Sequence, residues 1–321
     1  MSETTHPLIS VCIPVFDGAN FIRESVESIL NQTEKNFELL VVDNCSTDQT
    51  VKIVAGYDDP RIRLCVNPRN VGLIANFNKC IELAKGDFIV LLPHDDVLLP
   101  TALEAFSQAL LADSDIGLAY SSFYSIDERG NKLRLMSRDR EDRVMTGNEA
   151  FAMLAEGCPI QCAMTRRDVY SRLGSWDTTL IMTCDWDMWC RIALAGYKYT
   201  YISTPQNCYR VHPENGFRAY VLDNTYRDAV FRGFEKVYAA IPAQSDLQKL
   251  KAVSASKWIL RPQLKHLVFS LVTGQWKAVR QDLELLAKIV RWAGPFTLLP
   301  FLLEMPLELM KWLGRRLEGT S

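Results

Sequence analysis

The stretch LISVCIPVFDGANFIRESVESILNQTEKNFELLVVDN, residues 8–44, decides the fold. It begins with a β-branched run at 9–15, continues with apolar residues at helical spacing (Ile22, Val26 and Ile29), and returns to an apolar run at 37–43. We expect a strand, a helix with Asn20 as its N-cap, and a second strand. Because a helix that connects two neighbouring strands usually makes them parallel, the stretch predicts an α/β fold.

The same alternation continues as far as residue 121. Strand-like runs recur at 61–67, 87–92 and 117–121, and helical spacing recurs at 50–57, 76–84 and 101–111. This order predicts a parallel sheet with helices on both faces. The segment 122–165 has little periodicity and many charges, so we expect a solvated excursion there.

Each of four consecutive predicted strands ends in a segment that contains polar residues. These segments are Phe16-Asp17, Asp43-Asn44, Asn67–Asn70 and His94-Asp95-Asp96. Asp and Asn are common loop residues, so any one of these positions is unremarkable. Because ligands of such sheets bind beyond the carboxyl ends of the strands, the four positions together predict a binding site.

Two glycine motifs that bind phosphates in other nucleotide-binding proteins do not occur in this sequence. The first strand is not followed by Gly-x-Gly-x-x-Gly, and the chain has no Gly-x-x-x-x-Gly-Lys. Asp95-Asp96 instead favours a hard cation such as Mg²⁺, which one or two carboxylates hold together with substrate phosphates. The alternative is a loop turn, or a cap for the helix that begins near Thr101.

Composition indicates a soluble, globular chain with an uneven charge distribution. The 321 residues are 48% hydrophobic and 23% charged, and the formal net charge of −2 argues against a nucleic-acid binder. Residues 251–321 carry 11 Lys and Arg against 5 Asp and Glu, whereas the rest of the chain carries 25 against 33. Four of the seven tryptophans also lie in 251–321. The two parts are therefore expected to do different things.

The cysteines and the N-terminus favour a cytoplasmic protein. The nine cysteines include no Cys-x-x-Cys pair, and several lie in apolar runs, so we expect reduced core residues. Residues 1–7 lack the basic start of a signal peptide. The longest uncharged run, 292–303, contains two prolines and is too short to span a bilayer.

The ordered set of motifs resembles family 2 glycosyltransferases, which have the GT-A fold. ISVCIPVFD at 9–17 resembles the family's SVIIPVYN, and ELLVVDNCSTD at 38–48 resembles EIIVVDDGSTD. NVG at 70–72 and AKGD at 84–87 precede PHDD at 93–96, which stands where the family has its Asp-x-Asp metal motif. GSWD at 174–177, CDWDMW at 184–189 and YRVH at 209–212 resemble the later motifs. The likeness covers residues 8–216.

The resemblance implies a Rossmann-like catalytic domain, with a nucleotide-sugar donor and Mg²⁺ or Mn²⁺ as cofactor. It makes Asp185 the general base, with Asp187 as second choice, and assigns the metal to Asp96 and His212. Residues that would contact the nucleotide-sugar are Pro14, Val15, Phe16, Asp17, Asp43, Asn44, Asn70, Asp95 and Arg210. Asp185 also begins a predicted helix at 186–194, whose Trp186 and Trp189 favour core packing. One carboxylate acting as base is sufficient for an inverting single displacement.

Two departures from the family pattern keep other functions open. Pro93 and Cys184 stand where the family often has acidic residues. A catalytically silent nucleotide-sugar-binding or scaffolding protein of the same fold is the first alternative. A nucleotidyltransferase is the second, but only Arg23 offers a cation near the first strand. The absence of a Gln-x-x-Arg-Trp segment favours addition of a single sugar over processive synthesis.

The C-terminal part reads as helical and outside the resemblance. We predict a catalytic domain over 1–218 and a helical region over 219–321. Val279, Leu283, Leu286 and Val290 mark one apolar face, and 303–317 has a wide apolar face beside basic residues. Such a face packs on protein or lies in a membrane interface; the basic, Trp-rich composition favours the membrane. The chain is thus expected to be a peripheral enzyme at the inner face of the cell membrane, acting on a glycan or glycolipid acceptor.

Overall fold

The computed structural model describes residues 7–213, 224–260, 266–267, 270–271 and 274–294. The chain divides into two compact units. The first comprises Met1–Ala150 and Pro159–Asn215, and the second comprises Phe151–Cys158 and Gly216–Ser321. The second unit therefore takes in a short segment from the middle of the sequence.

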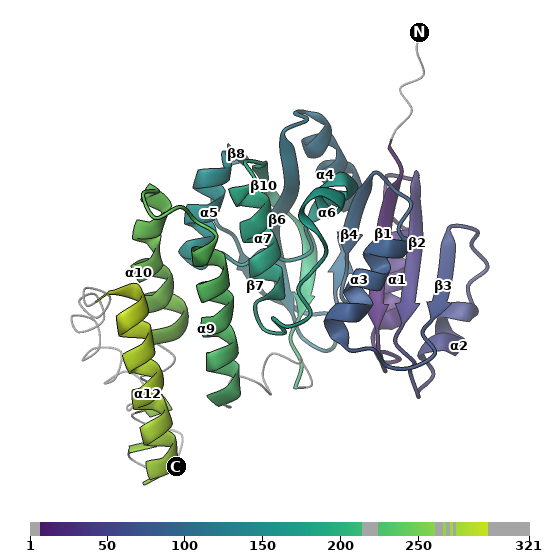
Figure 1. Cartoon of the computed structure of the whole chain (residues 1–321). Helices are drawn as coiled ribbons and strands as arrows, with labels where there is room; N and C mark the ends of the chain where they lie inside the picture. The colour runs from purple at the N-terminus through teal and green to yellow at the C-terminus, as the bar shows by residue number, and fades with distance from the viewer. Residues whose placement is uncertain (1–6, 214–223, 261–265, 268–269, 272–273, 295–321) are drawn as a thin grey trace. The chain divides into compact units, whose positions relative to one another are not determined.

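The first unit is built on a mixed sheet with the strand order β3-β2-β1-β4-β9-β6-β10-β5, and β7 and β8 extend it beside β6 and β10 (Figure 1). The strands are β1 (Ile9–Val15), β2 (Phe37–Asp43), β3 (Ile62–Val66), β4 (Phe88–Leu91), β5 (Val97–Leu98), β6 (Ile116–Ile126), β7 (Lys132–Met136), β8 (Arg143–Met145), β9 (Met164–Arg166) and β10 (Lys198–Arg210). The predicted first and second strands match β1 and β2 residue for residue.

The prediction of a parallel sheet is right for one half of the sheet and wrong for the other. β1 pairs in parallel with β2 and β4, and β2 pairs in parallel with β3. β9 then inserts antiparallel between β4 and β6, and β10 is parallel to β6 but antiparallel to β5 and β8. The segment 122–165 is accordingly not a plain excursion, because it supplies the end of β6, all of β7 and β8, and the start of β9.

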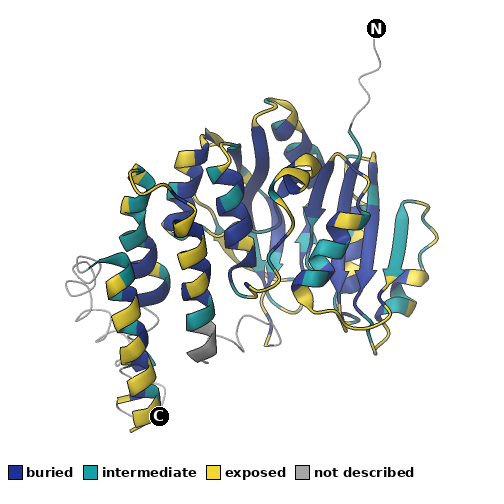
Figure 2. Cartoon of the chain, viewed as in Figure 1, coloured by how far each residue is buried: buried dark blue, intermediate teal, exposed yellow. Residues whose placement is uncertain are grey.

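Helices cover both faces of the sheet, as the alternation predicts. α1 (Ile22–Leu30), α2 (Thr50–Ala55) and α4 (Ala102–Leu111) share one apolar core with the odd-numbered residues of β1 and β2. α3 (Leu73–Leu83) lies on the other face, where the Cys12 thiol of β1 approaches the Cys80 carbonyl of α3. Phe77 of α3 and Trp189 of α7 (Cys184–Leu194) both pack edge-on against Trp176. α6 (Arg167–Leu173) follows β9 directly. Figure 2 shows buried residues along the central strands and exposed ones on the outer sides of the helices.

The expected N-cap of the first helix is wrong by one residue. The N-cap of α1 is Phe21, which makes no side-chain capping bond. The Ile22 amide instead donates to the carbonyl of Gly18 at 3.0 Å. A main-chain oxygen therefore accepts from the first turn of the helix, where we expected the side chain of Asn20, which is exposed.

The described part of the second unit is helical, as predicted. It contains the end of α5 (Gly147–Ala155), α9 (Asn224–Ala239), a 3₁₀ turn (Asp246–Leu250), α10 (Lys251–Ser254), a π-helical turn (Ala255–Leu260) and α12 (Trp276–Ala293). Trp292 of α12 packs edge-on against Phe231 and Tyr238 of α9, with the Lys251 ammonium over its ring at 4.4 Å. These aromatic contacts hold α12 and α9 together.

The buried face of α12 differs from the predicted one. Its buried residues are Val279, Asp282, Leu285 and Ile289, whereas Leu283 is 53% exposed. The carboxylate of Asp282 accepts from His266 at 2.8 Å, and this partner allows a polar residue to enter the core. The prediction from hydrophobic spacing placed the charged Asp282 on the solvent side of the helix, and it therefore selected the neighbouring face.

The apolar face predicted over 303–317 lies outside the described residues. Among the helices of the described ranges, none is both long and apolar enough to cross a bilayer.

Candidate active site

The predicted site segments do meet at one edge of the sheet. Val15, Asp43 and Val66, the last residues of β1, β2 and β3, lie side by side in the parallel ladder. β4 runs in the same direction, and the turn 93–96 follows it. The loops after four strands therefore surround the carboxyl edge, where ligands of such sheets bind.

Asp17 and Asp43 join the loops that follow β1 and β2. The carboxylate of Asp43 is buried and accepts from the amide and the hydroxyl of Ser46. The Ser46 hydroxyl in turn accepts from the Asp17 amide at 2.9 Å, and the Asp17 carboxylate accepts from the Thr47 amide at 2.6 Å. Asp17 adopts a left-handed conformation, with φ of 50°, to make this turn. Phe16 beside it is 43% exposed, whereas Pro14 and Val15 are buried.

Asn44 organises the loop after β3. Its side-chain oxygen accepts from the Val71 amide at 2.9 Å and from the Asn67 side chain at 3.1 Å. Its side-chain nitrogen donates to the Asn70 side-chain oxygen at 2.9 Å, and that oxygen also accepts from the Gly72 amide. Asn44 is only 2% exposed, so its polar atoms shape the loop, while the exposed Asn70 remains at the surface.

This role predicts a large loss of stability for Asn44→Ala. The substitution leaves the Val71 amide without its acceptor and removes one of the two acceptors of the Asn67 side-chain nitrogen, which also donates to Asn76. We expect the free energy of unfolding to fall by about 2–4 kcal/mol. Asn20→Ala, at an exposed site without a capping role, is the matched control and should change it by less than about 0.5 kcal/mol. Urea denaturation of both variants measures the difference; equal effects would contradict the role of Asn44.

Asp95, Asp96, Arg210 and His212 come together from distant parts of the sequence. Nε2 of His212 lies 3.0 Å from a carboxylate oxygen of Asp95, and both side chains keep some exposure, 8% and 16%. Asp96 is 1% exposed, and its Oδ1 accepts from the Arg210 amide at 2.9 Å. The guanidinium of Arg210 is fully buried and donates to protein oxygens.

The two neighbouring carboxylates have different environments. Burial, and secondarily the charge of Asp95, raises the pKa of Asp96 well above its ordinary value. The Oδ2 atom of Asp96 has no hydrogen-bond partner within the described ranges. Asp95 is the more accessible of the two and lies against His212. Of the pair, Asp95 is therefore the carboxylate better able to meet a ligand from solvent.

Asp95 and His212 can bind a divalent cation if phosphate oxygens of a bound ligand complete the coordination of the cation. No group of three or more His, Cys, Asp or Glu side chains within the described ranges is arranged to hold a metal by itself. A carboxylate and an imidazole are nonetheless ligands that Mn²⁺ accepts, and Mg²⁺ commonly takes only one or two protein ligands beside phosphate oxygens. Asp95 with His212 meets this requirement, and the unpartnered Asp96 oxygen lies one residue away.

Asp185 and Asp187 occupy the first turn of α7 but differ in what they contact. Asp187 is buried and pairs with Arg191 at 2.9 Å, and Arg191 also donates to the carbonyls of Leu173 and Ser175. Asp185 is exposed, and its carboxylate accepts from the Trp186 amide. Desolvation by the surrounding protein raises the pKa of Asp185 above its ordinary value, although its surface remains accessible to solvent. Trp186 and Trp189 are buried, as expected.

Several residues that complete the site carry no sequence signal of their own. Ser25 of α1 donates to the carbonyls of His94 and Asp96 at 2.7 Å, which fixes the turn after β4. Glu24 of α1 pairs with Arg210 at 2.5 Å. The amphipathic pattern of α1 identifies Ser25 and Glu24 only as polar helix positions, because their partners are about 70 and 186 residues away.

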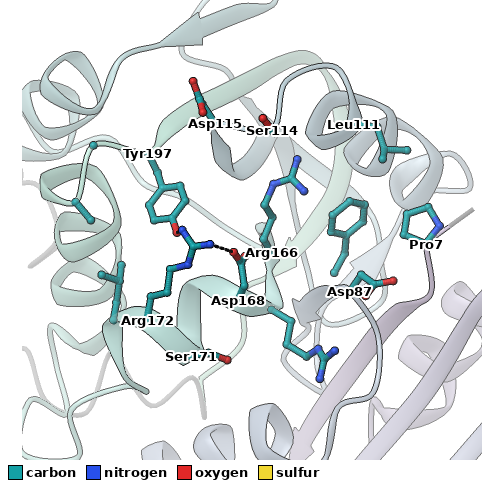
Figure 3. Close-up of a pocket in the computed structure, with 15 residues that line it drawn as sticks. Pro7, Asp87, Leu111, Ser114, Asp115, Arg166, Asp168, Ser171, Arg172 and Tyr197 are labelled. Atoms are coloured by element: carbon teal, nitrogen blue, oxygen red, sulfur yellow. Dashed lines mark hydrogen bonds and ion pairs between the residues drawn. The ribbon is translucent and has the colours of Figure 1, made fainter.

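A separate cavity of about 1000 Å³ lies at the opposite end of the strands, before β4, β6 and β10 (Figure 3). None of the predicted site residues lines it. Arg172 there pairs with Asp168 at 3.1 Å, and Arg166 donates to main-chain carbonyls. Asp87 and Asp115 also line the cavity, so its charges are balanced and point to no particular ligand.

Comparison with solved structures defines the class of fold. S. aureus TarS residues 1–349, in complex with UDP-GlcNAc, superposes with a TM-score of 0.63 at 17% identity, covering 77% of this chain and 70% of that one. A mannosyltransferase from Pyrobaculum calidifontis, in complex with GDP-Man and Mn²⁺, gives 0.57 at 20% identity, covering 90% and 84%. The first unit therefore has the GT-A fold of nucleotide-sugar transferases.

Sequence comparison gives the family. The model of glycosyl transferase family 2 matches residues 10–174. An uncharacterized glycosyltransferase of Methanocaldococcus jannaschii is 31% identical over 215 residues, which is 66% of this chain and 73% of that protein. A second from Rickettsia typhi is 31% identical over 197 residues, 59% of this chain and 60% of its own length. The chain belongs to glycosyl transferase family 2, which confirms the resemblance drawn from the motifs.

Proposed function

We propose that this glycosyltransferase moves one sugar from a nucleotide-diphosphate sugar to an acceptor hydroxyl by a metal-assisted, inverting displacement. The observation that carries the proposal is the Asp95–His212 pair, in which Asp95 of the turn after β4 meets His212, two residues after the end of β10. The GT-A fold and the family support the donor class. The donors bound by the two solved relatives, UDP-GlcNAc and GDP-Man, are the first to test.

Exposed side chains around this edge are the best candidates for the nucleotide. Phe16, Asp17 and Asn70 present accessible surface, whereas Asp43 and Asn44 use their polar atoms to hold loops. We therefore assign direct contact to the first three and loop support to the other two, with Pro14 and Val15 contributing main-chain surface only.

For the metal we favour Asp95 with His212, and for Asp96 a supporting role. The sequence-based assignment gave the metal to Asp96 with His212 and placed Asp95 among the residues that contact the nucleotide-sugar. The greater exposure of Asp95, its contact with His212, and the bond of Asp96 to the main chain of Arg210 support the exchange. A bound divalent cation would stabilise the negative charge that develops on the departing diphosphate.

The base that we assign is Asp185. An acceptor hydroxyl must lose its proton as it attacks, and a carboxylate with a raised pKa is a stronger base than an ordinary one. Asp187 is held by Arg191 and is thereby unsuited to this role. Asp185 is thus the accessible carboxylate of the two, and one such base is sufficient for a single displacement with inversion.

The test is a thermal-shift screen of nucleotide sugars with and without Mn²⁺, followed by assay of donor cleavage. A donor-specific shift together with cleavage supports a transferase. A shift without cleavage in the presence of acceptor candidates would favour the catalytically silent binding protein. That alternative rests on Pro93 and Cys184, which stand where the family often has acidic residues. Binding of no nucleotide sugar would overturn the proposal.

We further propose that the enzyme works on a lipid-linked or surface-polysaccharide acceptor at the cytoplasmic face of a membrane. On α12, Trp276 is 70% exposed, and Leu283, two turns further on, is 53% exposed. Lys277, Arg280 and Arg291 are exposed on the same helix. Exposed apolar side chains beside cations are what an anionic lipid surface attracts.

This proposal predicts that Trp276→Glu weakens binding to phosphatidylglycerol vesicles. We expect at least a roughly tenfold loss of affinity, because one inserted aromatic residue is replaced by a charge of the wrong sign. Sedimentation with vesicles measures it, with Leu133→Glu, at another exposed apolar site outside the helical unit, as control. Equal losses in both variants, or no binding by the unaltered chain, would contradict a membrane role for α12.

A further inference from the structure

Arg210 is fully buried although it carries a permanent charge. It is the last residue of β10, and none of its surface is accessible. A buried guanidinium is costly unless its donors are satisfied by nearby acceptors. Where those acceptors lie therefore shows what the residue holds together.

One side of Arg210 holds the acidic turn after β4. Its amide donates to Oδ1 of Asp96 at 2.9 Å, and its Nε donates to the carbonyl of Asp95 at 2.8 Å. Two consecutive residues of the turn are thus fixed, one by its side chain and the other by its main chain. His212, two residues further along the chain, lies against the Asp95 carboxylate.

The other side of Arg210 reaches two distant segments. Nη1 donates to the carbonyls of Asp127 and Glu128, between β6 and β7, at 3.1 and 3.2 Å. Nη2 donates to the carboxylate of Glu24 on α1 at 2.5 Å. The side chain of Glu24 is 51% exposed, so the pair has one end in solvent and the other in the core.

Phe21, the N-cap of α1, packs against both His212 and Arg210. Its ring centroid lies 4.9 Å from that of His212, and the Arg210 guanidinium carbon lies 5.0 Å from the Phe21 ring centroid. The start of α1, the turn 95–96 and the end of β10 therefore form one packed cluster around the guanidinium.

We infer that Arg210 is a positioning residue, and that its ion pair with Glu24 holds the Asp95–His212 pair in place for the metal. This goes beyond the proposed function and rests on it. Arg210 is one of the residues that the family resemblance assigns to the nucleotide-sugar, but its buried guanidinium is bonded to α1, to the acidic turn and to the β6–β7 turn. Glu24 becomes a site residue that no motif contains.

Glu24→Gln tests the inference with little risk to folding, because Glu24 is half-exposed and Gln keeps an acceptor oxygen. The control is Glu27→Gln, on the exposed side of the same helix one turn later, where the carboxylate accepts from the Tyr57 hydroxyl at 3.2 Å. Calorimetry with UDP and GDP in EDTA gives the metal-free nucleotide affinity, and Mn²⁺ titration of the nucleotide complex gives the metal affinity.

A positioning role predicts that Glu24→Gln raises the Mn²⁺ dissociation constant at least fivefold and changes nucleotide affinity in EDTA less than twofold, with Glu24→Asp partly restoring the metal affinity. Glu27→Gln should change neither. Loss of nucleotide affinity in EDTA with unchanged Mn²⁺ affinity would overturn the inference and favour phosphate binding by Arg210. No change in either quantity would also overturn it. If the unaltered chain binds neither UDP nor GDP nor any nucleotide sugar of the thermal-shift screen, the proposed function itself fails, whatever the effect of Glu24→Gln.

Discussion

Asp185→Asn should abolish sugar transfer while leaving donor binding intact. Removal of a general base costs roughly 10²–10⁴-fold in rate, and we expect about 10³-fold for kcat. The affinity for the nucleotide-sugar should change less than twofold, because Asp185 lies on α7 and has no hydrogen bond or ion pair with the Asp95 turn within the described ranges. Initial rates and calorimetric donor binding measure the two effects.

The raised pKa of Asp185 adds a second expectation to the same variant. Because the folded state disfavours the ionised carboxylate, Asp185 contributes less stability when it is ionised than when it is protonated. A neutral Asn removes this cost, so the melting temperature at neutral pH should stay level or rise. In the unaltered enzyme, activity should be lost on acidification as pH falls through the raised pKa, above the ordinary value of 3.8.

Asp187→Asn is the matched control, from the same turn of the same helix. It removes the charge that holds Arg191 and, through it, the carbonyls of Leu173 and Ser175, so its main effect should be a lower melting temperature. If Asp187→Asn lost transfer at full stability while Asp185→Asn stayed active, the base would have to be reassigned.

The parallel half of the sheet could be predicted from sequence because its order is local. β1 and β2 are adjacent in the sequence, and their apolar runs match the observed strands from Ile9 to Val15 and from Phe37 to Asp43. α3 was predicted to begin at Asn76 but begins at Leu73 after Gly72, whose φ of 89° ends the preceding loop. A start set by a glycine conformation has no hydrophobic period to reveal it.

The antiparallel half could not be predicted in this way. β9 is three residues long, and Thr165 pairs with Ile89 of β4 and Leu118 of β6, 76 and 47 positions away. The position of such a short strand depends on the two neighbouring strands with which it pairs, β4 and β6, much more than on its own sequence. The same limit applies to the site: motifs identified Asp95, Arg210 and His212 as polar residues of interest, but only the fold shows that Arg210 is buried and that Asp95 meets His212.

Asp95→Asn should cause the second large loss, and Asp96→Asn should not reproduce it. If Asp95 with His212 holds the metal, a neutral amide at 95 weakens stabilisation of the departing diphosphate by about 3 kcal/mol, or roughly 10²-fold in kcat/KM. The Mn²⁺ concentration for half-maximal rate should rise as well. His212→Gln should act in the same direction, because it removes the imidazole that lies against Asp95.

Asp96→Asn distinguishes this assignment from the one made on motif order. Asn keeps an oxygen for the Arg210 amide but removes a charge that burial already disfavours, so the half-maximal Mn²⁺ concentration should stay within twofold of that of the unaltered enzyme. A change in the melting temperature is expected instead, because Asp96 is a buried charge close to the guanidinium of Arg210. If Asp96→Asn shifted the Mn²⁺ dependence and Asp95→Asn did not, the motif-based order would be correct. Asp95, the more accessible of the two carboxylates, would then contact the donor, and Oδ2 of Asp96, which has no hydrogen-bond partner within the described ranges, would bind the metal.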